Sequence, residues 1–452
     1  MVASEGGNTT GRASSKGIVR IDRLDTEEGT RAAARLTRRF NDDAAACADA
    51  VREILARVRQ EGDAALLDYC RRFDAPGMEL PGLKVSAEEF QEAEALVDAG
   101  LRASIDFAAE RIRSFHEREL PDSWMLTRPE GIITGRLVRA VDAAGLYVPG
   151  GREGSTPLVS SVLMNGIPAG IAGVRRRVMV TPPNRAGKVY PALLLAARSI
   201  GINEVYKLGS AWAVAALAFG TESIAPVEVI AGPGNQYVAE AKRQVMGRVR
   251  IDMLAGPSEV LIVADASARP AFIAADMLAQ AEHDPQALAL AIVCSAGQAD
   301  EVARELERQL PRLNRADIAR TALKEHGHIF ITEDLDTAIA LANDIAIEHL
   351  ELHLADPWSQ LPAIRHAGAV FLGHYSPEAA GDYVAGPNHV LPTMGTAKIA
   401  SALGVETFLK QISLIHYTPE ALRGEVDHIR LLAELEGLDA HAKSALLRLN
   451  ES

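Results

Sequence analysis

The chain is poor in the features that mark several large classes of protein. Its three cysteines, Cys47, Cys70 and Cys294, are widely spaced in 452 residues, which excludes a disulfide framework and a cysteine-rich structural zinc site. No apolar run reaches the roughly 18 to 20 residues that a membrane-spanning helix needs, and residues 1–16 lack the apolar segment of a signal peptide. We therefore expect a cytoplasmic protein with no membrane partner.

Positive charge is also scarce. There are 47 Lys and Arg against 60 Asp and Glu, the net charge is −13, and no basic stretch is interleaved with aromatic residues, which argues against a nucleic-acid partner. The length and the 48% content of hydrophobic residues are enough for a large core and for two or more domains. These values favour a globular enzyme that acts on small metabolites.

Short strand-like runs that alternate with helix-like segments dominate the chain from Gly135 onward. Strands separated by helices of about 10 to 15 residues predict βαβ units and parallel sheets. Helix-period segments at 42–73, 87–115 and 419–450 predict helical extensions at both ends. The predicted fold is therefore α/β, with two Rossmann-like, incomplete parallel-sheet domains and helical N-terminal and C-terminal extensions.

Residues 226–265 organise this pattern, because two Gly-Pro turns there follow strand-like runs. The turns are AGPGN at 231–235 and AGPSE at 255–259. A strand, a tight loop and a helix start present free backbone N–H groups to a polar ligand, and loops at the carboxyl ends of parallel strands form ligand clefts. Neither loop is a GxGxxG or Walker A sequence, so two ordinary Pro-Gly turns are the alternative.

Four polar positions outside these turns are candidates for chemistry. Gln280 and His283 lie three residues apart at the end of a helix expected over 270–283, as a pair of metal ligands or as a solvated helix end. Glu348 and His349 open the alternating run EHLELHL. One interpretation is an exposed strand with a polar face. The other is functional: a neutral imidazole takes a hydroxyl proton near pH 7, and a carboxylate beside it activates water.

Two further residues have no assignable role from the residues alone. Asp382 lies in an expected loop, Gly381-Asp382-Tyr383, where turn geometry would explain it. His441 lies in the C-terminal helical segment, where it could be a core or surface residue.

All of these positions match the pattern of one known family: the chain resembles the histidinol dehydrogenases from about Asp42 to about Leu449. The motifs that carry the resemblance are YVPGG at 147–151, AGPGN at 231–235, IDMLAGPSEV at 251–260, AQAEH at 279–283, EHLEL at 348–352, GDY at 381–383, GPNHVLPT at 386–393 and EGLDAH at 436–441. The resemblance implies a zinc-dependent, NAD-linked, four-electron oxidation of L-histidinol via L-histidinal to L-histidine. It also implies one Zn²⁺ per subunit and a homodimer in which the C-terminal segment of one subunit completes the other's active site.

The resemblance further implies roles for individual residues. His349 would be the base that takes the alcohol proton, and Glu348 would activate water for the second oxidation. The implied zinc ligands are Gln280, His283, Asp382 and His441. The implied substrate contacts are Ser258, Gln280, His283, His349, Asp382, Glu436 and His441, the implied NAD contacts are Tyr147, Trp212 and Asn235, and His389 is a neighbour without an assigned role.

The chain departs from the family at one implied NAD contact. Many members have Gly-Gly-Ala-Gln where this sequence has Gly209-Ser210-Ala211-Trp212, so an amide is replaced by an indole that can stack but cannot accept a hydrogen bond. Two alternative functions follow. One is a related zinc- and NAD-dependent dehydrogenase of another polar alcohol, such as a sulfopropanediol; the other is a binding protein that has lost catalysis, which the intact Glu348 and His349 disfavour.

The expected domain organisation has four parts. Residues 1–40 form a tail and helical arm, of which residues up to about Gly17 have a disordered composition. Residues 41–146 with 259–403 form a first α/β domain, and 147–258 form a second α/β domain on the NAD side. Residues 404–452 form the C-terminal helical segment that contributes to the partner subunit's site.

Overall fold

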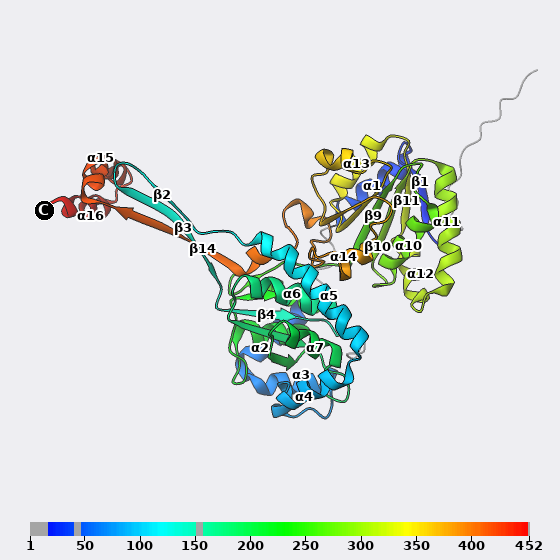
Figure 1. The fold of residues 1–452 in the computed structure, drawn as a ribbon, viewed down its shortest axis with the longest axis horizontal. Helices are drawn as coiled ribbons and strands as arrows, with labels where there is room; N and C mark the ends of the chain where they lie inside the picture. Colours follow the sequence, from blue (N-terminus) through cyan, green and yellow to red (C-terminus); the bar gives the residue numbers. More distant parts are fainter. Residues whose placement is uncertain (1–16, 40–46, 151–156, 451–452) are drawn as a thin grey trace, which may run out of the picture.

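The computed structural model describes residues 17–39, 47–150 and 157–450 of the chain. The expected N-terminal tail and most of the Gly-rich loop at 149–155 lie outside these ranges. Two α/β lobes and a long extension make up the described structure (Figure 1). Both lobes are built on parallel sheets, which confirms the predicted fold class. Within the described ranges, no helix combines the length and apolarity required to cross a bilayer.

The first lobe contains a parallel six-stranded sheet with the order β1-β11-β10-β9-β12-β13. Its strands are β1 (Arg20–Arg23), β9 (Glu259–Ala264), β10 (Leu288–Val293), β11 (His328–Ile331), β12 (His349–His353) and β13 (Ala369–Leu372). Its helices are α1 (Glu27–Leu36), α10 (Pro270–Ala281), α11 (Ala296–Gln309), α12 (Ala316–Glu325), α13 (Leu335–Ile345) and α14 (Glu378–Tyr383). Alternate residues of β9 face α10 to α12 on one side and α1 and α13 on the other, as the period of two requires.

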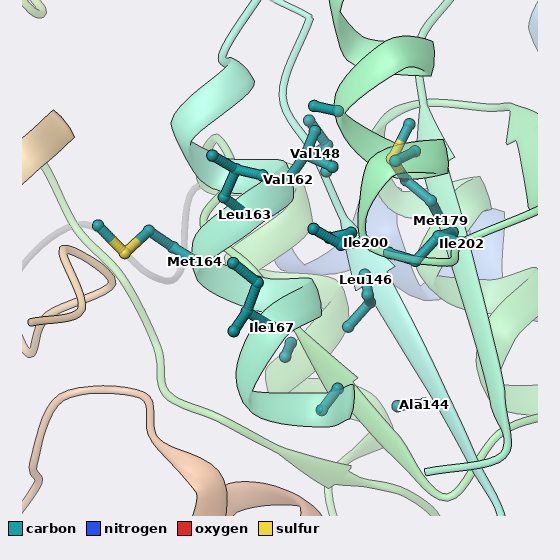
Figure 2. Close-up of a cluster of buried hydrophobic side chains, with 14 of the residues drawn as sticks. Ala144, Leu146, Val148, Val162, Leu163, Met164, Ile167, Met179, Ile200 and Ile202 are labelled. Atoms are coloured by element: carbon teal, nitrogen blue, oxygen red, sulfur yellow. The ribbon is translucent and has the colours of Figure 1, made fainter. Parts of the chain in front are cut away.

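The second lobe contains a parallel five-stranded sheet with the order β6-β5-β4-β7-β8. Its strands are β4 (Ala143–Tyr147), β5 (Arg176–Thr181), β6 (Glu204–Lys207), β7 (Val229–Ala231) and β8 (Arg250–Ile251). The helices between them are α6 (Val159–Ile171), α7 (Pro191–Ser199), α8 (Ser210–Phe219) and α9 (Gln236–Val245). Figure 2 shows the core on one face, where Leu146 of β4 and Met179 of β5 meet Ile167 of α6.

Four N-terminal helices also pack on this second lobe. They are α2 (Ala48–Glu61), α3 (Asp63–Phe73), α4 (Ala87–Leu96) and α5 (Ala99–His116). Helices α2 and α3 share a core with α8 and α9, and α4 and α5 share one with α6 and α7. The expected grouping of residues 41–146 with 259–403 differs from this packing, because the apolar faces of these helices are buried against the five-stranded sheet. Strand β1 instead extends the six-stranded sheet.

The extension is an antiparallel three-stranded sheet that ends in two helices. It contains β2 (Trp124–Thr127), β3 (Ile132–Ala140) and β14 (Leu409–Tyr417), followed by α15 (Pro419–Leu435) and α16 (Asp439–Asn450). A short turn separates the two helices at Gly437, which has a φ of +70°. Short 3₁₀ turns complete the described structure at Leu80–Leu83, Glu117–Glu119, Leu310–Arg312, Trp358–Ala363, Thr396–Lys398 and Val405–Phe408.

A buried ion pair ties together the two loops that organise the sequence. Lys242 of α9 pairs with Asp252, and both side chains are almost fully buried. Lys242 Nζ also donates to the carbonyl oxygen of Gly232 at 2.9 Å, and Asp252 accepts from the N–H of Gly232 at 2.7 Å. Gly232 needs to be glycine, because its φ is +115° and a Cβ atom would lie 2.1 Å from the carbonyl oxygen of Tyr147. The loop after β7 is therefore fixed to the segment after β8.

We expect Lys242→Met to lower the free energy of unfolding by roughly 3 to 5 kcal/mol, because Asp252 would remain buried without its counter-charge. Urea denaturation measures the change. The control is Lys324→Met, the same substitution at an exposed position of α12, which should change stability by less than about 0.5 kcal/mol. Equal effects of the two substitutions would show that the buried pair does not stabilise the loops.

Candidate active site

Strand β12 supplies the two residues at the centre of the candidate site. Glu348 directly precedes the strand and His349 begins it, and they are 6% and 4% exposed. The strand lies between β9 and β13, so its ladder is paired on both sides. The alternative of an exposed strand is therefore wrong, since all of His349–His353 is buried.

The backbone of Glu259, the first residue of β9, fixes the tautomer of His349, and burial keeps the ring neutral. His349 Nδ1 lies 2.9 Å from the carbonyl oxygen of Glu259, which can only accept, so Nδ1 carries the proton. His349 Nε2 is buried and has no hydrogen-bond partner among the described residues. Burial lowers the pKa of His349 to about 3, so the ring is neutral near pH 7 with a free lone pair on Nε2.

Glu348 is held by the same backbone segment. Its Oε2 accepts from the N–H of Glu259 at 2.8 Å, and burial raises its pKa well above the usual value. The Glu259 side chain is itself anchored, because Arg39 donates to its two carboxylate oxygens at 2.6 and 2.7 Å. Ser258, which precedes Glu259, is half-buried beside this pair.

Helix α14 and the residues after α10 supply a group of side chains that could hold a metal ion. Ligand atoms of His283, Glu378 and Asp382 lie within 4.8 Å of one another. Helix α10 ends at Ala281, so His283 follows the helix and does not belong to its last turn as expected. Asp382 lies on the short helix α14 and not in a loop.

Gln280 joins this group through Glu378. Its amide orientation is assigned from its hydrogen bonds, in which the nitrogen lies 2.6 Å from each oxygen of the Glu378 carboxylate. This orientation turns the Gln280 oxygen away from the Glu378 carboxylate. The side chains of Gln280 and Glu378 are buried, that of Asp382 is half-buried, and that of His283 is exposed.

Glu378 is a site residue that the sequence reading missed. It lies 3.7 Å from His349 Nδ1 and thus between the candidate base and the metal-binding group. Its spacing of four from Asp382 would place both carboxylates on one helix face, but the Gly and Pro residues around it gave no helix signal.

The site has an excess of buried acidic groups. Burial raises the pKa of Glu378 well above its usual value, with further increases from Asp382 and Glu348, and burial raises the pKa of Asp382 to about 6. A cation would stabilise the ionised forms of these carboxylates. The amide oxygen, imidazole and carboxylate donors present suit Zn²⁺.

His389, whose role was left open, lies close to the same group. Burial lowers the pKa of His389 to about 4, and repulsion from the positive charge of a protonated His283 lowers it further. Its Nε2 is buried without a partner among the described residues.

Glu436 and His441 do not join the other residues within one chain. Glu436 follows α15 and His441 lies on α16. Figure 1 places these helices at one end of the molecule's longest axis, whereas α10 and α14 lie in the lobe at the other end. If these two residues act at the site, a second copy of the chain must bring them.

The carboxyl edge of the five-stranded sheet supplies the expected NAD contacts. Tyr147 ends β4, and Asn235 follows β7 and caps α9 by accepting from the N–H groups of Tyr237 and Val238. Strands β4 and β7 are neighbours, and the connections leave them in opposite directions across the sheet. This is the topological switch point at which open α/β sheets bind nucleotides.

Trp212 on α8 occupies an aromatic stack. Its ring lies 5.4 Å from that of Tyr69 and 5.5 Å from that of Phe73, with interplanar angles of 12° and 19°. It is 5% exposed, and its Nε1 has no partner among the described residues. Nearby, the hydroxyl of Tyr147 accepts from the N–H of Ser210 at 3.1 Å.

Comparisons with known proteins agree on one family. The family model described as histidinol dehydrogenase matches residues 37–449. The chain is 61% identical over 426 residues to the histidinol dehydrogenase of Desulfotalea psychrophila, covering 94% of this chain and 98% of that protein. It is 50% identical to that of Geobacillus kaustophilus, covering 89% and 94%. The crystal structure of histidinol dehydrogenase from Elizabethkingia anophelis superposes with a TM-score of 0.89 at 36% identity, covering 96% and 99%.

The low pKa of His349 predicts a pH dependence of stability in the metal-free protein. The unfolded chain takes up a proton on this residue near pH 6.5, whereas the folded protein does not until about pH 3. The contribution of the neutral ring is thus present above pH 6.5 and is lost as the pH falls. We expect the stability difference between wild type and His349→Gln to fall by up to about 1.4 kcal/mol per pH unit between pH 6 and 4.

Urea denaturation of both proteins at each pH measures this difference. Above pH 7 it should be flat. A difference that grows on acidification would mean that the imidazole is charged in the folded protein.

Proposed function

Because the chain belongs to the histidinol dehydrogenase family, we propose that it oxidises L-histidinol via L-histidinal to L-histidine and reduces two NAD. This is the last step of L-histidine biosynthesis. The observation that carries the proposal is the free Nε2 lone pair of the neutral, buried His349. Such a group is a general base suited to an alcohol proton near pH 7.

In the first oxidation, His349 Nε2 takes the proton of the alcohol hydroxyl while the carbon that bears this hydroxyl transfers hydride to NAD. The Nδ1 proton stays on Nδ1, which donates it in a hydrogen bond to the Glu259 carbonyl oxygen, and this supports the division of roles between the two ring nitrogens. Nδ1 of the resulting imidazolium lies 3.6 Å from Glu348 Oε2 and 3.7 Å from Glu378 Oε1, so these carboxylates can stabilise its positive charge.

In the second oxidation, Glu348 takes a proton from water as the water oxygen adds to the aldehyde carbon. The hydrate then loses hydride to a second NAD and yields the carboxylate. The raised pKa of Glu348 supports this role, because its ionised form is a stronger base than an exposed carboxylate.

The proposed zinc ligands are Gln280, His283 and Asp382 of one chain and His441 of a second copy. The convergence of His283 and Asp382 supports these two ligands, and the contact of Gln280 with Glu378, a member of the same group, supports the third. When bound, Zn²⁺ would hold the imidazole and amino nitrogens of the substrate and so orient the reacting carbon. Ser258 and Glu436 are proposed as further substrate contacts.

The nicotinamide cofactor of this dehydrogenase is proposed to bind to the second lobe, through residues 147–258. Tyr147 and Asn235 flank the switch point between β4 and β7, which supports this assignment. Trp212 is retained as a proposed contact through its backbone or ring edge, since its ring already packs against Tyr69 and Phe73.

We further propose a homodimer in which each extension completes the partner's site. The separation of α16 from α10 and α14 supports it (Figure 1). So does the exposure of large apolar residues on the extension, which marks an interaction surface. They are Trp124, Met125 and Leu126 of β2, Ile412 and Ile415 of β14, and Leu431, Leu432 and Leu435 of α15.

The stoichiometry of the reaction tests the proposed function. We expect the zinc-loaded protein to form two NADH per L-histidinol consumed, because the aldehyde is oxidised before it leaves. Chelation should abolish the reaction, and added ZnCl₂ should restore it. Absorbance at 340 nm and quantified L-histidine measure both quantities. One NADH per substrate would remove Glu348 from its role, and none with zinc bound would favour another polar alcohol as substrate.

Hybrid dimers test the shared site. We expect His349→Asn and His441→Ala homodimers to be inactive, whereas a dimer with one subunit of each kind retains about half of wild-type activity. In that hybrid, one site combines an intact His349 with an intact His441 from the other subunit. Two different affinity tags isolate the hybrid after co-expression.

The matched control places both substitutions on one subunit and pairs it with wild type. A shared site predicts no activity for this dimer, because each site lacks one residue. If instead the control keeps half of the activity and the first hybrid has none, each site is formed by a single chain.

A further inference from the structure

A second group of metal-binding side chains lies outside the candidate active site. It consists of Asp276 on α10 and of Glu351 and His353 on β12, and ligand atoms of all three lie within 4.8 Å of one another. Asp276 lies one helical turn before Gln280. His353 ends β12 opposite Ala264, the last residue of β9, so the group is at the carboxyl edge of the six-stranded sheet.

The position of this group is one where α/β sheets bind ligands. The strand order places β9 next to β12, with the chain continuing to β10 on one side and to β13 on the other. This is the switch point of the six-stranded sheet, the counterpart of the β4–β7 switch point in the other lobe. The candidate active site uses the opposite, amino edge of β12, so this switch point has no role in the proposed reaction.

The distances within the group match those between ligands of one metal ion. His353 Nε2 lies 3.1 Å from Glu351 Oε2 and 3.5 Å from Asp276 Oδ2. Two donors that each bind a metal at about 2.0 to 2.2 Å, at angles of 90° to 110°, are separated by roughly 2.9 to 3.6 Å. The three side chains are therefore already spaced for one small divalent ion.

Three of the polar atoms in this group are buried without a hydrogen-bond partner among the described residues. His353 is 1% exposed and Glu351 is fully buried, yet Glu351 Oε2 and both ring nitrogens of His353 make no hydrogen bond among the described residues. The imidazole nitrogen faces two carboxylate oxygens at contact distance but in a geometry that forms no hydrogen bond. Buried polar atoms rarely remain unsatisfied, so this arrangement calls for a missing partner between them.

The missing partner should be positive. Burial raises the pKa of Asp276 to about 8 and that of Glu351 to about 7, and no Lys or Arg is among the groups that shift either pKa. A proton shared between the two carboxyl groups is one way to remove the excess charge. That proton leaves both nitrogens of His353 unsatisfied, whereas a cation between the three side chains would bind both carboxylates and also His353 Nε2.

We propose that Asp276, Glu351 and His353 bind a second divalent transition-metal ion, distinct from the one assigned to Gln280, His283 and Asp382. One imidazole with two carboxylates selects ions such as Zn²⁺ or Mn²⁺ over Mg²⁺ and Ca²⁺, which prefer oxygen ligands. His374 lies at the edge of the site, with its ring 5.9 Å from that of His353 and its Nδ1 unpartnered within the described structure.

The ion has a structural role. It cross-links α10 to β12, and Glu351 also accepts the first N–H of α14, that of Glu378, at 2.8 Å. Helices α10 and α14 carry Gln280, Glu378 and Asp382, so the second ion would fix the elements that carry the first site. The second metal site would be present whether or not the protein oxidises histidinol.

Metal stoichiometry tests the proposal. The full-length protein is stripped with a chelator, dialysed against ZnCl₂ or, in parallel, MnCl₂, freed of unbound ion and analysed by mass spectrometry for metal per chain. We expect two ions per wild-type chain and one per chain of Asp276→Asn or of Glu351→Gln. Both substitutions keep the size of the side chain, and the second keeps the acceptor for the N–H of Glu378. Circular dichroism verifies that the variants fold.

Two controls separate the second ion from the first. Asp344→Asn makes the same change at an exposed position of α13 and should keep two ions. His283→Ala should also retain one ion, which Asp276→Asn in the same chain then removes. One ion per wild-type chain that survives Asp276→Asn and is lost in His283→Ala would overturn this proposal and leave the first zinc site intact. Two ions in Asp276→Asn would equally overturn it.

Discussion

The site depends on burying polar side chains along one face of a central β-strand. Leu350 and Leu352 of β12 pack into the apolar core on one side, while His349, Glu351 and His353 face the other. This polar face is covered by α10 and α14, since Asp276 of α10 lies 3.5 Å from His353 and Glu378 of α14 donates its N–H to Glu351. Each polar group must be satisfied by what packs against it, and the surrounding helices and loops supply those partners.

The two lobes share a strand order but use it differently. Apart from the edge strand β1, each sheet starts at an inner strand, extends to one side and then to the other, so each has one switch point. In the five-stranded sheet, the expected NAD contacts flank the carboxyl edge at this point. In the six-stranded sheet, Glu348 and His349 lie at the amino edge. The segment between β8 and β9 joins these edges, and the Lys242–Asp252 pair fixes its start.

The alternation of strands and helices predicted the fold class correctly, because a period of two and a period of 3.6 are local properties of the sequence. The motifs of the family pointed to Gln280, His283 and His349. The burial of β12 could not be predicted, since HLELH is typical of a strand with one exposed polar face, and that face is buried by α10 and α14, which are distant in the sequence. Likewise, no local signal tells which sheet the apolar faces of α2 to α5 will cover.

The three-stranded sheet of the extension was the largest feature that the sequence did not predict. Its strands β3 and β14 are distant in the sequence, and β14 follows a long irregular segment, so no hairpin signal connects them. Glu378 was missed for a similar reason, because helix α14 has only six residues and lies between Pro and Gly.

The pairing of β3 with β14 also has a consequence for synthesis of the chain. Strand β3 leaves the ribosome long before β14, and until then one edge of the β2–β3 hairpin has no partner over the nine residues that β14 later covers. The C-terminal helices acquire their position only when this last strand is added. Assembly of the lobes therefore precedes assembly of the extension, and an open strand edge accompanies each nascent chain in between.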